Sequence, residues 1–118
     1  MSIKVSGCIR GLSQKYTDGV ERQEIWINKR DAAPLQYKNK MRIPIKLHIG
    51  SESFDAGIRA TQDTEYVWIC PDMRDSRNKK TCLAHVLGKE GFSKNQKVVL
   101  DVNGENIRIS PDTLKMNR

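Results

Sequence analysis

Alternation of apolar and polar residues near the middle of the chain restricts the possible folds more than any other feature. The segment 43–49 (IPIKLHI) places an apolar residue at every second position, which is typical of a strand with one buried and one solvated face. Two further segments have the composition of strands, and short polar stretches separate them: 54–60 and 66–70. Because the connections are too short for a helical crossover, we expect an antiparallel meander. The last strand is apolar throughout, which favours burial on both faces.

The residues before the meander predict another pair of strands. The segment 2–12 indicates a short, kinked strand, and 24–29 (EIWINK) indicates its return. Between them lies a polar stretch with Asp18-Gly19 at its centre, a dipeptide that favours a tight turn. The segment 30–40 has no clear period, so we expect a loop with at most one helical turn.

The residues after the meander predict a polar loop, a helix and a hairpin. Thr81 can cap a helix over 82–90, and Gly91 followed by Phe92 fits a Schellman ending. Asn103-Gly104 is a strong hairpin signal between two apolar runs. A two-residue loop at this position predicts that Leu100 lies opposite Ile107 and Val98 opposite Ile109.

Length and composition fit one small, mostly β domain. The chain has 118 residues, of which 37% are hydrophobic, and only two Trp and two Phe, so we expect a thin core such as that of a small barrel. The domain is predicted to cover 1–110, with 111–118 as a tail or linker. No apolar run is long enough to span a membrane. The three cysteines are unevenly spaced and are predicted to be reduced thiols of an intracellular protein.

Motifs for metal binding and catalysis are missing from the sequence. There is no Cys-x-x-Cys pair, no glycine-rich phosphate loop and no Gly-x-Ser-x-Gly elbow. Pro71-Asp72 invites comparison with metal-dependent nucleases, but no later acidic residue is followed two positions on by Lys. We therefore expect no cofactor, no metal and no catalysis by this domain, and strand termination as the role of Pro71-Asp72.

Basic charge is concentrated in a few polar segments. Lys plus Arg number 21 against 14 Asp plus Glu, a net charge of +7, which favours polyanionic partners. Solvated loops without a ligand have similar composition, but these segments mix phosphate-neutralising with base-reading side chains. The densest runs are 29–40 and 74–80, and a weaker group consists of Gln14, Lys15, Arg22 and Gln23.

Several packing motifs together resemble a known family. They are Ile43-Pro44 at a strand start, Tyr66-Val67-Trp68-Ile69, the short helix 83–87 running into Gly91-Phe92, and the strand entry 94–100. Over Ile25 to Ile109 the chain resembles the B3-like effector domain of restriction endonucleases of the EcoRII, BfiI and NgoAVII kind, which is distantly related to plant B3 transcription factor domains. The family's Gly-Asp is replaced here by Asn95-Gln96.

The resemblance implies a seven-stranded open pseudobarrel with one or two short helices and two arms that grip the DNA major groove. It places Arg59 on the floor between the arms, in contact with phosphate or paired with a carboxylate. The N-arm is expected to contain Lys29, Arg30, Gln36, Tyr37, Lys38 and Asn39, with Gln14, Lys15 and Arg22. The C-arm is expected to contain Arg74, Asp75, Arg77, Asn78, Lys79 and Lys80.

The sequence thus leads to one main hypothesis and two alternatives. The main one is sequence-specific binding of double-stranded DNA by a non-catalytic recognition module of a restriction-modification system. The nuclease is then a domain after Arg118 or a partner chain, and the expected location is the cytoplasm of a bacterial or archaeal cell. The alternatives are an RNA-binding β-barrel, disfavoured because few aromatic residues are expected outside the meander, and a small enzyme of unrecognised type.

Overall fold

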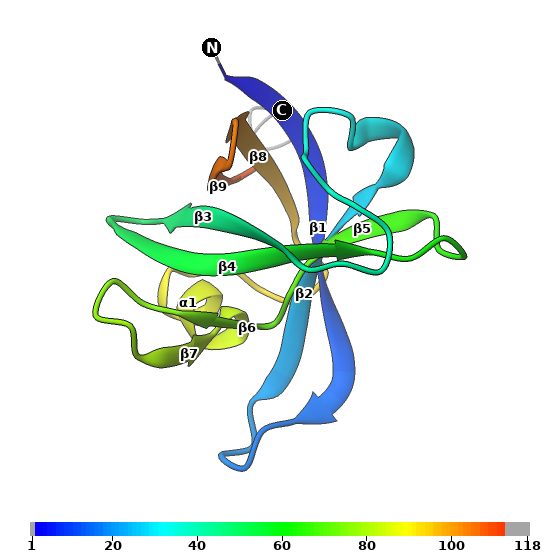
Figure 1. Cartoon of the computed structure of the whole chain (residues 1–118). Helices are drawn as coiled ribbons and strands as arrows, with labels where there is room; N and C mark the ends of the chain where they lie inside the picture. The colour runs from blue at the N-terminus through cyan, green and yellow to red at the C-terminus, as the bar shows by residue number, and fades with distance from the viewer. Residues whose placement is uncertain (1, 113–118) are drawn as a thin grey trace, which may run out of the picture.

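Nine strands, one α-helix and one 3-10 turn make up residues 2–112, the part of the chain that the computed structural model describes (Figure 1). The strands that build the barrel are β1 (Ile3–Lys15), β2 (Glu21–Asn28), β3 (Ile43–Ile49), β4 (Glu52–Ala60), β5 (Tyr66–Ile69), β8 (Lys97–Asn103) and β9 (Asn106–Pro111). The remaining elements are η1 (Lys29–Asp31), β6 (Asp72–Arg74), β7 (Lys80–Cys82) and α1 (Leu83–Lys89).

Seven of these strands form a closed barrel. They follow the order β3-β9-β8-β1-β2-β5-β4, and an additional antiparallel pairing of β3 with β4 closes the ring. The mostly β class with a single short α-helix agrees with expectation, but the predicted open barrel is wrong. The physical reason lies in β3, which pairs along both edges: antiparallel with β4 and parallel with β9. A strand paired on both edges leaves no backbone groups exposed there.

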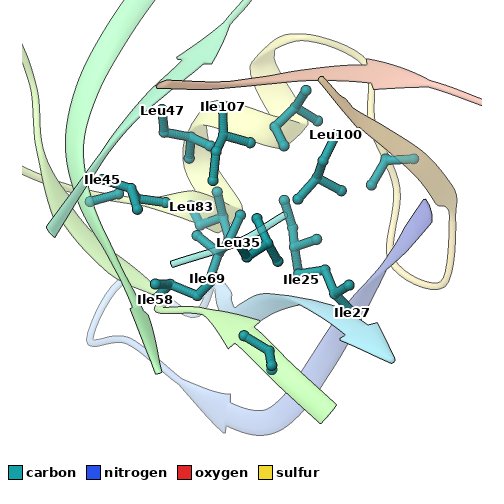
Figure 2. Packing of buried hydrophobic residues seen from close by; sticks show 14 of the residues in the cluster. Ile25, Ile27, Leu35, Ile45, Leu47, Ile58, Ile69, Leu83, Leu100 and Ile107 are labelled. Atoms are coloured by element: carbon teal, nitrogen blue, oxygen red, sulfur yellow. The ribbon is translucent and has the colours of Figure 1, made fainter. Parts of the chain in front are cut away.

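The barrel interior is filled by branched aliphatic side chains that alternate along the strands (Figure 2). Ile45, Leu47 and Ile49 of β3 are buried, as the period of two predicted. The segment between η1 and β3 adds Leu35, and α1 adds Leu83; both belong to the same core cluster. Burial of each such side chain stabilises the fold by about 1.5–3 kcal/mol.

The strand β5 differs from the prediction in a way that matters for the surface. Val67 and Ile69 are fully buried, whereas Trp68 is half-buried and Tyr66 is exposed. The strand therefore alternates, and the expectation that both of its faces are buried is wrong. The meander itself is confirmed, because β4 pairs antiparallel with both β3 and β5.

The two expected hairpins are present, one of them in a different register. Asp18-Gly19 lies in the turn between β1 and β2, with Gly19 at a φ of +88°. Between β8 and β9, Asn103 pairs with Asn106, so the loop is Gly104-Glu105 and Leu100 faces Ile109. The predicted pairs were displaced by two residues, which leaves the same side chains facing the core.

The region 74–90 contains more regular structure than expected. The polar loop is the turn of a hairpin between β6 and β7. Thr81 lies in β7, and Cys82 occupies the helix N-cap without a side-chain hydrogen bond, so the predicted cap is wrong. At the other end, the Phe92 N–H donates to the Leu87 carbonyl at 2.8 Å beyond a left-handed Gly91, which confirms the Schellman ending.

The expected tail at 111–118 lies largely outside the described residues. Pro111 is the last residue of β9. No helix within residues 2–112 is long and apolar enough to cross a membrane.

Candidate nucleic-acid interface

Two hairpins extend away from the barrel in different directions (Figure 1). One is the outer part of β1–β2, which points downward in the view; the other is β6–β7, which points to the left. In the β1–β2 hairpin, the register of the pairing shifts between Gly11 and Lys15 of β1. An irregularity of this kind bends the strand and changes its direction. The β6–β7 hairpin is attached to the barrel through the pairing of Asp55 with Arg74.

A continuous recess follows the outer surface of the barrel between these hairpins. Its first hollow, of about 470 Å³, lies between β1–β2 and the β4–β5 surface, and Gln14, Arg22, Arg59 and Trp68 line it. The second, of about 710 Å³, lies between β3–β4 and β6–β7, with Lys46, Arg74 and Lys80 in its wall. Arg42 and Asp72 line both hollows, so we treat the two as one site, called the recess below.

Arg42 lies across the centre of the recess because β4 has a glycine beneath it. A Cβ on Gly57 would collide with the Arg42 guanidinium. The guanidinium also donates from Nη2 to the Asp72 carbonyl at 3.4 Å. The missing side chain at Gly57 therefore permits Arg42 to lie flat against the barrel and join the two hollows.

Asp72, at the start of β6, connects the two hairpins. Its carboxylate accepts hydrogen bonds from the Tyr16 hydroxyl at 2.8 Å and from Arg22 Nη2 at 3.1 Å. Arg22 in turn lies 5.3 Å from the centre of the Tyr16 ring. Partial burial, followed by the bond to Asp72, raises the pKa of Tyr16. The hydroxyl thus stays protonated and acts as a donor that fixes the base of one hairpin against the other.

The β1–β2 hairpin is braced by two further side-chain contacts. His85 of α1 lies 2.9 Å from the Asp18 carboxylate, and Lys94 lies 2.9 Å from Glu21. The Val20 N–H, with His85, lowers the pKa of Asp18, and Lys94 lowers the pKa of Glu21. These pairs are exposed, so each contributes little stability alone, but together they restrict the direction of the hairpin.

The turn of β6–β7 is organised by its own aspartate. Asp75 Oδ1 accepts from the backbone N–H groups of Arg77 and Lys79, each at 2.9 Å, and these bonds lower the pKa of its carboxyl. Arg74 Nη1 donates to the Asn78 carbonyl at 2.9 Å, and Asn78 adopts a left-handed φ of +63°. The carboxylate therefore shapes the turn and leaves the side chains of Arg77 and Lys79 projecting into solvent.

Several cations around the recess form no salt bridge. In the described residues the side chains of Lys15, Arg59, Arg77, Lys79 and Lys80 make no hydrogen bond or ion pair, although Lys15 helps to lower the pKa of Glu21, and Lys79 and Arg77 that of Asp75. Of the acidic side chains in the recess walls, Asp55 is paired with Lys46 at 2.6 Å, Asp72 is occupied by Tyr16 and Arg22, and Glu24 accepts from Trp26. Glu105 also lines the second hollow, and its side chain makes no hydrogen bond or ion pair within the described residues. The cations without a salt bridge outnumber Glu105, and this excess of positive charge favours an anionic ligand.

Some of the predicted site residues are brought together. Gln14, Arg22 and Arg59 line one hollow of the recess, and Arg74 and Lys80 line the other. Lys15 lies at the outer end of β1, and the β6–β7 turn contains the remaining C-arm residues, which are Asp75, Arg77, Asn78 and Lys79.

The other predicted N-arm residues lie elsewhere, because the segment 29–40 is tied to the barrel by the buried Ala32 and Leu35 instead of forming an arm. Lys29 and Arg30 line a separate hollow beside Gln62, and Lys29 Nζ donates to the Thr61 carbonyl. Tyr37 packs against the core. Gln36 and Lys38 are exposed, and Asn39 forms a bridge with Ala60.

The residues that the sequence analysis missed are Tyr16, Arg42, Lys46 and Asp72. A signal existed for two of them, since Arg42 and Lys46 occupy the polar positions that alternate with Ile43 and Ile45. Nothing in the sequence indicates that Tyr16 and Asp72 meet, because 56 positions separate them.

Metal ligands do not gather in this region: within residues 2–112 no three His, Cys, Asp or Glu side chains are placed to hold an ion. Comparison of the chain with protein-family models, with curated proteins and with solved structures found no match.

Proposed function

We propose that this chain binds double-stranded DNA in a sequence-specific manner, with the β1–β2 and β6–β7 hairpins as its two arms and the recess as the surface that faces the phosphate backbone. The observation that carries the proposal is the set of cations without a salt bridge around the two hollows of the recess, between two hairpins. Phosphate contacts supply most of the affinity of such complexes, and base contacts supply specificity.

The hairpin turns supply the base-reading side chains of this proposal. Arg77 and Asn78 project from a turn that Asp75 holds in a defined shape, and Gln14 extends from the other hairpin. Arg pairs well with guanine and Asn or Gln with adenine in the major groove, which admits a two-stranded ribbon. Arg42 and Arg59 on the floor contact phosphates.

The resemblance to B3-like domains supports the same conclusion and extends it to a biological role. In that role the domain recognises a DNA site for a restriction-modification system, and a nuclease domain or partner subunit performs the cleavage. The segment 29–40 takes no part in the grip in this arrangement, because Ala32 and Leu35 tie it to the barrel core.

Selection from a random duplex pool tests the proposal directly. We expect enrichment of one short sequence motif, and a selected duplex that outcompetes a scrambled one. The test variant carries both Arg59→Ala and Arg77→Ala. The control variant is Lys4→Ala, which removes an exposed charge from the other end of β1. Failure to enrich any motif, or equal binding by both variants, would refute the proposal.

A second substitution tests the geometry without changing any charge. Gly57→Ala introduces a methyl group where the Arg42 side chain lies, so it displaces the guanidinium while the protein keeps every cation. We expect weaker binding of all duplexes and a folded protein by circular dichroism, because only a flexible side chain has to move. Unchanged affinity would show that Arg42 has no part in binding.

A further inference from the structure

An aromatic strip lies on the outer face of the barrel, next to the recess. Trp26 of β2 and Trp68 of β5 are directly opposite each other across the two strands. The Trp26 and Tyr66 rings are 5.0 Å apart at an angle of 41°. Their strand neighbours Ile25 and Val67 are fully buried, so the three rings point away from the core. We call Trp26, Tyr66 and Trp68 the outer aromatic strip.

Arginines lie on both sides of this strip. The Arg10 guanidinium is 5.2 Å from the centre of the Trp26 ring. On the other side Arg59 is the cross-strand partner of Trp68, and it makes no hydrogen bond or ion pair within residues 2–112. The strip thus combines flat apolar surfaces with positive charge, the two requirements for binding single-stranded nucleic acid.

The rings are held in place but remain accessible. Trp26 Nε1 donates to Glu24 at 2.8 Å, which fixes the indole orientation. Tyr66 is 39% exposed, and it is one of three large apolar side chains that are exposed in the described residues. Burial raises the pKa of Glu24, and this partly buried carboxyl is already occupied by the Trp26 N–H. Contact with water does not stabilise exposed aromatic rings, so a fixed aromatic surface of this kind is typical of a binding site.

We propose that the outer aromatic strip binds unpaired nucleotides, with bases stacked on Tyr66 and Trp68 and phosphates against Arg10 and Arg59. The RNA-binding alternative is disfavoured in the sequence analysis because few aromatic residues are expected outside the meander, whose last strand is predicted to be buried on both faces. That strand instead carries Tyr66 and Trp68 on its outer face, which removes the objection. The proposal is separate from duplex binding by the hairpins, although Arg59 and Trp68 also line the recess, so the two surfaces adjoin and share these two residues.

Tryptophan fluorescence gives a direct assay, because the chain has only two tryptophans and both belong to the strip. A thymidine oligonucleotide of about 12 nucleotides should quench the emission in a saturable way. A uridine oligonucleotide of the same length distinguishes DNA from RNA, and binding of either supports the proposal. Absence of quenching by both would overturn it.

Three variants locate the binding. Tyr66→Ala should weaken the affinity about tenfold. Because Tyr66 is exposed, the variant should stay folded, and a loss of affinity then reports on the contact with the oligonucleotide. Ile3→Ser removes another exposed apolar side chain, at 52% exposure, and should bind normally. Arg77→Ala, in the β6–β7 turn, should also bind the oligonucleotide normally. If Arg77→Ala abolishes single-strand binding, or Tyr66→Ala leaves it unchanged, the strip is not the site, whatever the outcome with duplex DNA.

Discussion

Substitution of Arg59 by alanine is the sharpest test of the recess as a phosphate-binding surface. Arg59 lies on the outer face of β4, is exposed, and makes no hydrogen bond or ion pair within the described residues. Its removal leaves no buried group without a partner, so the free energy of unfolding should change by less than about 0.5 kcal/mol. Any larger loss of DNA affinity then reports on the contact itself.

The magnitude follows from counting the cations around the recess. Apart from the base-reading Arg77, six of them form no salt bridge in the described part of the chain: Lys15, Arg42, Arg59, Arg74, Lys79 and Lys80. If each neutralises one phosphate, the slope of log K against log salt concentration is about −5.4, since each contact contributes about −0.9. Arg59→Ala should reduce the slope to about −4.5 and weaken all duplexes alike.

Fluorescence anisotropy with labelled duplexes at a series of salt concentrations measures this slope. Arg30→Ala is the matched control, because its side chain is 81% exposed and lines a separate hollow beyond the recess. It removes the same charge and should leave the slope nearly unchanged. The reasoning is refuted if the two variants lose the same number of contacts, or if the Arg59→Ala loss is confined to one DNA sequence, which would indicate base reading.

Three other predictions address specificity, packing and pH. Arg77→Ala should weaken binding of a selected site by about 1–3 kcal/mol and spare scrambled duplexes; competition binding measures both, and equal losses would indicate phosphate contact alone. Gly7→Ala should destabilise the protein by about 1–3 kcal/mol in urea unfolding, since a Cβ would lie 2.8 Å from the Leu100 side chain, and unchanged stability would contradict this packing. The lowered pKa of Asp75 implies that it stabilises its turn fully above the ordinary value of 3.8 and loses this effect as the pH falls through the folded pKa. The protection of the Lys79 amide against hydrogen exchange, measured relative to its intrinsic rate at each pH, should therefore fall in acid. Asp75→Asn should abolish that pH dependence of the protection; persistence in the variant would assign it to another group.

Features of the fold that depend on near neighbours could be predicted from the sequence. The burial of Ile45, Leu47 and Ile49 follows from the period of two, because successive side chains in a strand point to opposite faces. The Schellman ending at Gly91 is likewise local, because it requires only a residue that tolerates positive φ and a carbonyl a few positions earlier.

Reasoning from the period of two fails for the aromatic residues in the apolar run of β5. Tyr66 and Trp68 are hydrophobic by composition, yet they face outward while Val67 and Ile69 fill the core. Periodicity cannot separate a strand buried on both faces from one whose outer face carries rings, because both give an uninterrupted apolar segment. The distinction depends on which element covers the outer face, and that is a property of the whole fold.

Placement of the basic residues depends on the fold for a related reason. The run at 29–40 has four basic residues, as many as 74–80, but Ala32 and Leu35 are buried and tie this segment to the barrel. Arg42 comes just after it, and it reaches the centre of the recess because Gly57, fifteen positions later, has no side chain. Charge density along the chain therefore indicates an anionic ligand. Which of the cations can contact that ligand depends on their cross-strand neighbours in the fold.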